Sequence, residues 1–183
     1  LNAGLVVAPN IDSLVTGDPA TSKLPLEALA VEVWFEIATE KPGFYGLAAA
    51  QQDGTACRKG WSLGHSGAGA TTLITFQISL EGRDTTGYGV PFFARLTVEP
   101  GIRRGEWNHL AVTYDGASVA MYYNGELALD VPACDAPPCG RIIYPAAYHP
   151  SGQCIAKRTE LRIGAYQNAK VNSNFPHIGS IKY

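Results

Sequence analysis

The stretch that decides the fold is EWNHLAVTYDGASVAMYYNGEL, residues 106–127. Aromatic and β-branched residues alternate between two sides in 107–114, and again in 118–123, as the two-residue period of a β-strand requires. An Asp-Gly pair follows the first run and an Asn-Gly pair follows the second, and both pairs tolerate the positive φ of tight turns. The stretch therefore predicts an antiparallel meander of three strands, the third beginning near Leu127.

Other parts of the chain show the same alternation. It is clearest in 72–80, where Ile74, Phe76, Ile78 and Leu80 are expected to face the core. Further strands are predicted at 31–37, 45–50, 61–64, 92–98 and 161–165. No segment has the period of an amphipathic helix, and Gly, Pro and Asn separate the runs. This punctuation of many short strands predicts an all-β sandwich.

Three motifs resemble those of a known family. The central one is WNHLAVTYDG at 107–116 followed by MYYNGEL at 121–127, which resembles the signature of laminin-G-like and pentraxin-like domains. VEVWF at 31–35 and LRIG at 161–164 resemble an early and a late strand of that family. The resemblance covers nearly the whole chain. It implies a two-sheet antiparallel jelly-roll sandwich of the concanavalin-A-like kind.

Length and charge limit the partners. The 183 residues fit one domain, 1–183, and the net charge of -2 argues against a nucleic-acid partner. No apolar run approaches the roughly 20 residues of a membrane span, so we expect no membrane insertion. The chain opens without a basic-then-apolar leader. Because both ends resemble incomplete strands of the family, we expect a domain excised from a longer secreted or cell-surface protein, with other domains of that parent chain as partners.

The four cysteines allow three disulfide pairings. Cys134 and Cys139 bracket Asp-Ala-Pro-Pro, a turn-like spacer that suits a local disulfide, which leaves Cys57 to pair with Cys154. Two disulfides would place the protein in an oxidising, extracellular compartment. The alternative is a zinc site, but the spacing contains no C-x-x-C pair. We therefore expect disulfides.

Two patterns raise the question of catalysis. GWSLG at 60–64 matches the G-x-S-x-G nucleophile elbow, but the residues after it cannot form the helix that this mechanism needs. Glu32 and Glu36 flank Trp34 on one strand face, which would suit a glycoside hydrolase. Four residues of strand separate two Cα atoms by roughly 13 Å, and a charged, half-exposed face is the simpler interpretation. We expect no enzymatic activity.

The resemblance to pentraxins also implies a calcium site after the LRIG strand. The corresponding residues here are Tyr166, Gln167 and Asn168, with Asp53 from an earlier loop. Calcium prefers about six to eight oxygen ligands including carboxylates. Tyr166 and Asn168 replace residues that are acidic in a pentraxin, so at most a weak calcium site from Asp53, Asn168 and the Gln167 carbonyl is expected. The alternative is that these Asn residues cap turns.

The resemblance implies a non-catalytic recognition module that binds a glycan or a protein surface. We expect the ligand to meet the loops at 51–59, 132–154 and 166–176, with Tyr144, Tyr148 and Tyr166 as stacking contacts. Two alternatives stay open. One is a glycoside hydrolase, and the other is an architectural spacer attached to a catalytic domain.

Overall fold

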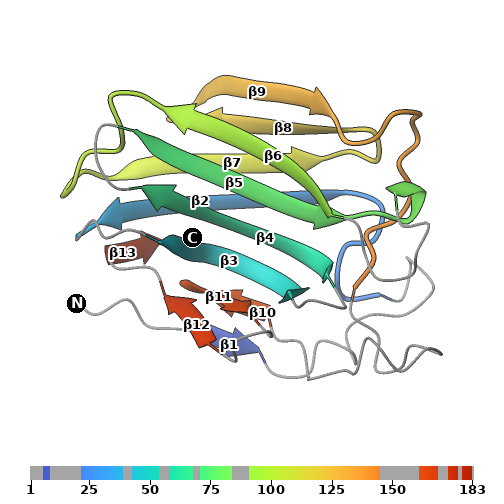
Figure 1. Cartoon of the computed structure of the whole chain (residues 1–183), viewed down its shortest axis with the longest axis horizontal. Helices are drawn as coiled ribbons and strands as arrows, with labels where there is room; N and C mark the ends of the chain where they lie inside the picture. Colours follow the sequence, from blue (N-terminus) through green and yellow to red (C-terminus); the bar gives the residue numbers. More distant parts are fainter. Residues whose placement is uncertain are drawn as a thin grey trace.

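The computed structural model describes residues 6–8, 22–38, 43–53, 58–67, 71–83, 91–144, 161–168, 173–176 and 179–182. Thirteen strands and one short 3-10 helix, Glu81–Arg83, occupy these residues. The strands form two sheets that face each other as the layers of a jelly-roll sandwich (Figure 1). The prediction of an all-β, two-sheet antiparallel fold is confirmed.

The five-stranded sheet contains the meander. Its order is β13 (Gly179–Lys182), β2 (Leu29–Ile37), β7 (Asn108–Tyr114), β8 (Ser118–Tyr123) and β9 (Glu126–Pro132). Asn124 and Gly125 form the two-residue turn between β8 and β9, with φ values of 51° and 87°. Only residues that tolerate this left-handed region at low cost fit such a turn.

The turn between β7 and β8 is one residue longer than the Asp-Gly pair suggests. Asp115, Gly116 and Ala117 all lie between the two strands. The Asp115 Oδ1 accepts hydrogen bonds from the backbone N–H groups of Ala117 at 2.9 Å and of Ser118 at 2.7 Å. These bonds hold the pKa of the Asp115 carboxyl below its ordinary value. The Asp side chain thus shapes the turn as an Asx motif.

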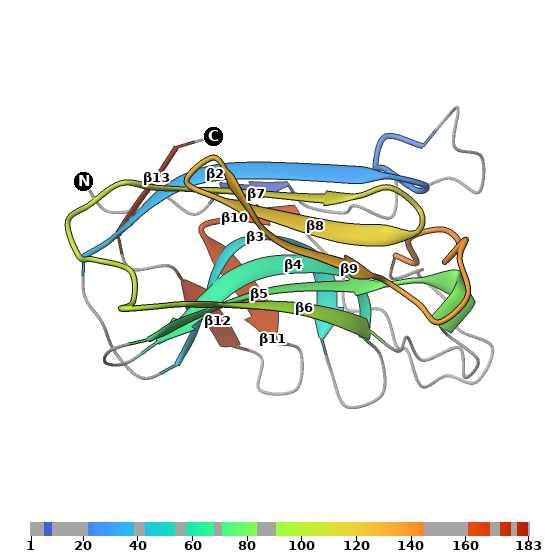
Figure 2. The same cartoon turned by 90° about the horizontal axis from the view of Figure 1, so that it is seen from above.

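The eight-stranded sheet forms the other layer. Its path runs β1 (Val6–Ala8), β10 (Leu161–Ile163), β3 (Phe44–Asp53), β4 (Arg58–Gly67), β5 (Thr72–Ser79) and β6 (Pro91–Val98). β11 (Ala165–Asn168) and β12 (Ser173–Pro176) form a hairpin that also pairs with β3. Two of the predicted loops are therefore wrong in part: β3 continues to Asp53, and much of 166–176 is strand. Figure 2 shows the two layers edge-on, with β11 and β12 on the side of β3 and β4 that faces away from the five-stranded sheet.

The core lies between the two layers. The inward residues of the cleanest predicted strand, β5, are fully buried, and so are Leu110 and Val112 of β7 and Met121 of β8. The largest side chains in this core include Phe35, Leu63, Phe76, Leu110 and Tyr114. Burial of this apolar surface, at roughly 25 cal/mol per Å², is what stabilises the sandwich.

A disulfide joins Cys134 to Cys139, with an S–S distance of 2.09 Å, as the spacing predicts. It closes a loop that packs on the β7–β8 turn, where the Cys139 N–H donates to the Gly116 carbonyl at 2.7 Å. Cys57 and Cys154 lie outside the described residues, so their pairing stays a prediction. No helix among the described residues is long and apolar enough to cross a membrane.

Candidate functional site

The predicted metal residues meet where β3 ends. Asp53 and Asn168 are Cα partners across the parallel β3–β11 bridge, and Gln167 precedes Asn168 in β11. The fold thus brings together residues that lie far apart in the sequence. Within the described part of the chain, no group of three or more His, Cys, Asp or Glu side chains gathers to hold a metal. The calcium site stays a prediction, and Asp53 is the one acidic residue among those predicted for it.

Of the three tyrosines predicted to contact a ligand, the structure describes the side chain of one, Tyr144. Tyr144 is only 5% exposed; its hydroxyl donates to the Pro25 carbonyl at 2.9 Å and accepts from Trp61 Nε1 at 3.2 Å. Burial raises the pKa of this hydroxyl well above its ordinary value. Tyr144 is thus a core residue, and the expectation that it offers a stacking surface is wrong. Tyr148 lies outside the described residues, and Tyr166 is part of β11.

A row of residues crosses the outer face of the eight-stranded sheet from β10 to β6. Consecutive ladder partners make up this row: Arg162, Ala49, Ser62, Gln77 and Phe93. Their neighbours along each strand, such as Trp61 and Phe76, face the core. The alternation of the strands therefore places the row on the opposite side, away from the five-stranded sheet.

The polar side chains of this outer face are unusually buried. Gln51, two residues beyond Ala49 on β3, is 2% exposed, and Gln77 and Arg162 are each 7% exposed. We call Gln51, Ser62, Gln77 and Arg162 the amide patch. Among the described residues, neither Oε1 nor Nε2 of Gln51 has a hydrogen-bond partner, and Nε2 of Gln77 has none either. A buried polar group without a partner costs about 1–3 kcal/mol, so such groups require an explanation.

Between the two glutamines, β4 contributes only small residues. Gly60 has a φ of 96°, and a Cβ there would collide with the carbonyl oxygen of Ala50, so no other residue fits. Ser62 lies two positions further along, with strand on both sides of it. The G-x-S-x-G pattern therefore belongs to a strand, as predicted. Its small residues, Gly60 and Ser62, lie between the Gln51 and Gln77 side chains. This run of small residues on β4 is the one sequence feature that could have indicated the amide patch.

The glycosidase alternative rests on β2, in the outer face of the five-stranded sheet. Trp34 is 45% exposed there and its ring lies 4.7 Å from the ring of His109, centroid to centroid. The Glu32 Oε1 lies 2.9 Å from His109 Nε2, in an exposed pair. Glu36 is four residues away on the same strand, farther than the roughly 5–9.5 Å that separate paired catalytic carboxylates. The arrangement is a surface cluster of an aromatic, a histidine and a carboxylate.

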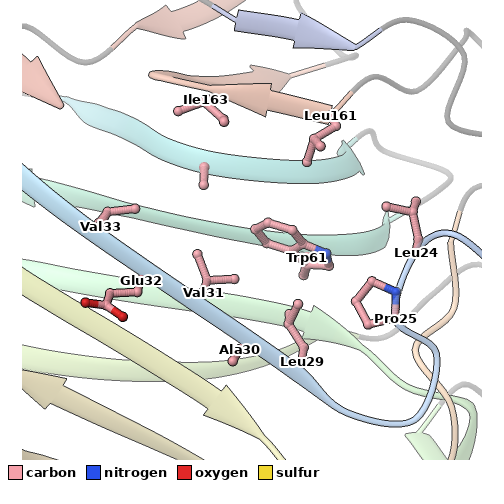
Figure 3. Close-up of a pocket in the computed structure, with 11 residues that line it drawn as sticks. Leu24, Pro25, Leu29, Ala30, Val31, Glu32, Val33, Trp61, Leu161 and Ile163 are labelled. Atoms are coloured by element: carbon pink, nitrogen blue, oxygen red, sulfur yellow. The ribbon is translucent and has the colours of Figure 1, made fainter. Parts of the chain in front are cut away.

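An apolar pocket of about 350 Å³ lies between the two layers (Figure 3). One wall comes from β2, through Leu29, Val31 and Val33. The other comes from the eight-stranded sheet, and it includes Trp61, Leu161 and Ile163. Sugar hydroxyls need hydrogen-bond partners that such a lining does not supply. The pocket is therefore chemically unlike the amide patch.

Comparison with known proteins agrees with this architecture. Residues 12–138 match the family model Laminin_G_3, described as the concanavalin A-like lectin/glucanases superfamily. The chain belongs to this superfamily. The resemblance stated from the sequence motifs is thereby confirmed. No curated protein matches the chain significantly.

Several solved structures are similar to this chain in fold. One is the Ruminococcus gnavus IT-sialidase CBM40 bound to α2,3-sialyllactose, at 14% identity and a TM-score of 0.58, covering 98% of this chain and 83% of that one. The same module bound to α2,6-sialyllactose is 14% identical with a TM-score of 0.57, and the match covers 98% of this chain and 84% of that one. Mouse laminin α1 domains LG4-5 are 9% identical with a TM-score of 0.52, and the match covers 99% of this chain and 38% of that one. At these identities the likeness establishes the fold alone.

Proposed function

We propose that this domain is a non-catalytic recognition module that binds a glycan at the amide patch. The observation that carries the proposal is the Gln51 side chain, which is 2% exposed and whose two amide atoms have no hydrogen-bond partner in the described part of the chain. A ligand that supplies a donor and an acceptor satisfies this amide. Sugar hydroxyls do both, because each is a donor and an acceptor.

The charge of the patch favours an acidic sugar. Arg162 lies on the same outer face, one strand from Ala49, and a guanidinium matches the geometry of a carboxylate. Two of the similar structures carry sialyllactose, whose sialic acid has a carboxylate. These relatives support the ligand class, and the amide patch supplies the chemistry. β11 and β12 lie on the same side of the sheet, so the glycan would reach the patch beside this hairpin (Figure 2).

The setting follows from the same proposal. We place the domain in a secreted or cell-surface protein, since the Cys134–Cys139 disulfide suits an oxidising compartment. Its partners would be the glycan and the other domains of a parent chain. Weak calcium binding at Asp53, Gln167 and Asn168, at the end of β3 that carries Gln51, would add a cation for an anionic sugar. A melt with and without EDTA tests this, because a bound ion raises Tm by mass action.

Titration calorimetry with sialyllactose tests the proposed function. We expect Gln51→Leu and Gln77→Leu each to weaken binding by about tenfold or more, since each removes a bond worth about 1.5 kcal/mol or more. Glu32→Gln, on the other sheet, is the control and keeps full affinity. Equal affinity of the unchanged chain and the three variants for sialyllactose would refute the site.

Two other results would favour the alternative functions. No binding to any acidic or neutral glycan on an array would favour a protein ligand or a spacer role. Hydrolysis of a β-glucan panel that Glu32→Gln abolishes would establish the glycosidase alternative.

A further inference from the structure

The five-stranded sheet carries large apolar side chains that are exposed to solvent. Among the described residues, three large apolar side chains are exposed: Trp34 at 45%, Trp107 at 39% and Leu127 at 57%. Trp34 lies on β2 and Leu127 on β9, and Trp107 directly precedes β7, so all three lie in or next to this sheet. Scattered exposed apolar residues are ordinary, but their gathering on one layer indicates a surface that another molecule covers.

Strand alternation sets Trp34 and Leu127 on the side of this sheet that faces away from the core. Phe35, next to Trp34 on β2, is fully buried in the core. Leu127 pairs with Tyr122 of β8, and Met121 beside that tyrosine is also fully buried. The eight-stranded sheet packs against the inner side of this layer (Figure 2), so these two exposed side chains lie on the outer face.

One ladder row crosses this outer face from β2 to β9. Glu32 of β2 pairs with Ala111 of β7. Ala111 pairs with Tyr122, which in turn pairs with Leu127. Three strand spacings of about 4.8 Å separate the two ends of the row, which is roughly 14 Å. Trp34 lies two residues from Glu32 along β2 and therefore on the same side. We call Glu32, Trp34, Tyr122 and Leu127 the outer row; it has a carboxylate and an indole at one end and apolar side chains at the other.

His109 of β7 holds the indole and the carboxylate in place. The centroid of its ring lies 4.7 Å from that of Trp34, and its Nε2 lies 2.9 Å from the Glu32 Oε1. The His109 side chain is 16% exposed, whereas that of Glu32 is 67% exposed. The histidine backbone N–H donates to the Asn124 Oδ1 at 2.8 Å. The exposed indole and carboxylate are thus fixed from below on a rigid sheet, which lowers the entropy cost of binding a ligand there.

The charge of this sheet favours a cationic partner over a second copy of the chain. Its five strands hold four carboxylates, on Glu32, Glu36, Glu126 and Asp130, and one basic side chain, on Lys182 of β13. Four negative charges and one positive charge give -3, whereas the whole chain is -2, so the rest of the chain is net positive. A symmetric contact between two copies would bring these carboxylates together, and like charges disfavour such a contact. A partner that presents basic side chains has the complementary sign.

We propose that the outer row binds a protein partner through an arginine or lysine side chain that sits on the Trp34 indole beside the Glu32 carboxylate. A cation is attracted to the face of an indole, and a guanidinium both stacks on an aromatic ring and pairs with a carboxylate. Tyr122 and Leu127 then supply apolar contact for the residues that follow the basic one. This surface belongs to the other sheet from the amide patch, so it does not depend on the proposed glycan function.

Two peptides that differ in one side chain test the proposal. The first, Gly-Arg-Thr-Ser-Thr-Leu-Gly, places arginine and leucine four residues apart, about 13 Å in an extended chain, which matches the length of the outer row. The second has citrulline, a neutral side chain of nearly the same shape, in place of arginine. We expect NMR titration of the domain to give at least about fivefold tighter binding for the arginine peptide, because only the cation gains from the indole and the carboxylate.

Variants of the domain locate the contact. Trp34→Ala and Glu32→Gln should each reduce the preference for the arginine peptide to about twofold or less, whereas Trp34→Tyr keeps an aromatic ring and should keep most of it. Gln77→Leu, in the amide patch, is the control and should bind both peptides as the unchanged chain does, whether or not a glycan binds at that patch. A thermal melt of each variant checks that it is folded.

Three results would overturn the proposal. Equal affinity for the two peptides, or no binding of either at millimolar concentration, would show that the outer row selects no cation. Chemical-shift changes at Trp34 with a neutral gluco-oligosaccharide, and none with the arginine peptide, would make this face a sugar-binding surface instead. A dimer that sedimentation detects and that Trp34→Ala abolishes would make a second copy of the chain the occupant.

Discussion

Replacing Gln51 by Leu should stabilise the free domain while it weakens ligand binding. Gln51 is 2% exposed, and neither polar atom of its amide has a partner within the residues that the structure describes. An unsatisfied buried amide costs about 1–3 kcal/mol, and Leu fills a similar volume without that cost. For a domain of this length, about 2–4 °C of Tm corresponds to 1 kcal/mol, so Gln51→Leu should raise Tm by about 2–12 °C.

Thermal and urea unfolding measure this effect in the absence of glycan. Gln51→Glu is the matched opposite, since it buries a carboxylate at the same position, and it should lower Tm. Gln77→Leu should be stabilising by a smaller amount, because of its two amide atoms only Nε2 is both buried and without a partner among the described residues. Thr113→Leu, on the exposed face of β7, sets the baseline and should change stability by less than about 0.5 kcal/mol.

The combination of outcomes decides between two explanations. If the amide serves a ligand, Gln51→Leu gains stability and loses affinity, as expected where a functional site is held at a cost to the fold. If ordered water satisfies the amide, Gln51→Leu loses or keeps stability, because the water bonds disappear with it. A drop in Tm for Gln51→Leu would therefore refute the reasoning from the unpartnered atoms.

Three further predictions concern residues that hold the frame. Tyr144→Phe removes the hydroxyl that bonds Pro25 and should cost about 1–3 kcal/mol in urea unfolding, with Tyr123→Phe as a comparison for a half-buried hydroxyl. Replacing Cys134 and Cys139 together by Ser should lower the free energy of unfolding by about 2 kcal/mol, as loop entropy predicts for so short a loop. The pKa of the Asp115 carboxyl is lowered in the folded state, so its stabilising effect is present above about pH 4 and is lost as pH falls through the folded value. Asp115→Asn should therefore make the free energy of unfolding depend less on pH in that acid range. An unchanged pH dependence there would contradict this reasoning.

The strands that face the core could be predicted from sequence because their signal is local. In β5 the apolar positions repeat every second residue, and burial of that side is the dominant energy of the fold. The β8–β9 turn was equally readable, since Asn124-Gly125 fits the positive φ that the turn requires. The prediction of the Asp115 turn was too short by only one residue. The difference arises because the Asp115 side-chain oxygen accepts the hydrogen bond of the Ala117 N–H.

The amide patch could not be predicted in the same way. Gln51 and Gln77 are polar residues at outward positions, and such residues are normally exposed. Their burial depends on what packs over the outer face, which strand alternation does not encode. The prediction that Tyr144 is an exposed contact was wrong because its burial depends on distant parts of the chain. It follows an irregular, proline-rich segment, yet its hydroxyl reaches Trp61 and Pro25, 83 and 119 residues away in the sequence. Contacts at that separation leave no pattern around the residue itself.

The amide patch and the apolar pocket differ in the chemistry that each could use. The amide patch holds hydrogen-bond donors, acceptors and a guanidinium but little apolar surface, so a ligand there would depend on hydrogen bonds. The pocket along β2 is lined almost entirely by apolar side chains, so it can bury apolar surface but supplies few hydrogen bonds. The two lie on opposite sides of the eight-stranded sheet, one on its outer face and the other on its inner face. A polar ligand at the outer face would therefore draw no affinity from the pocket.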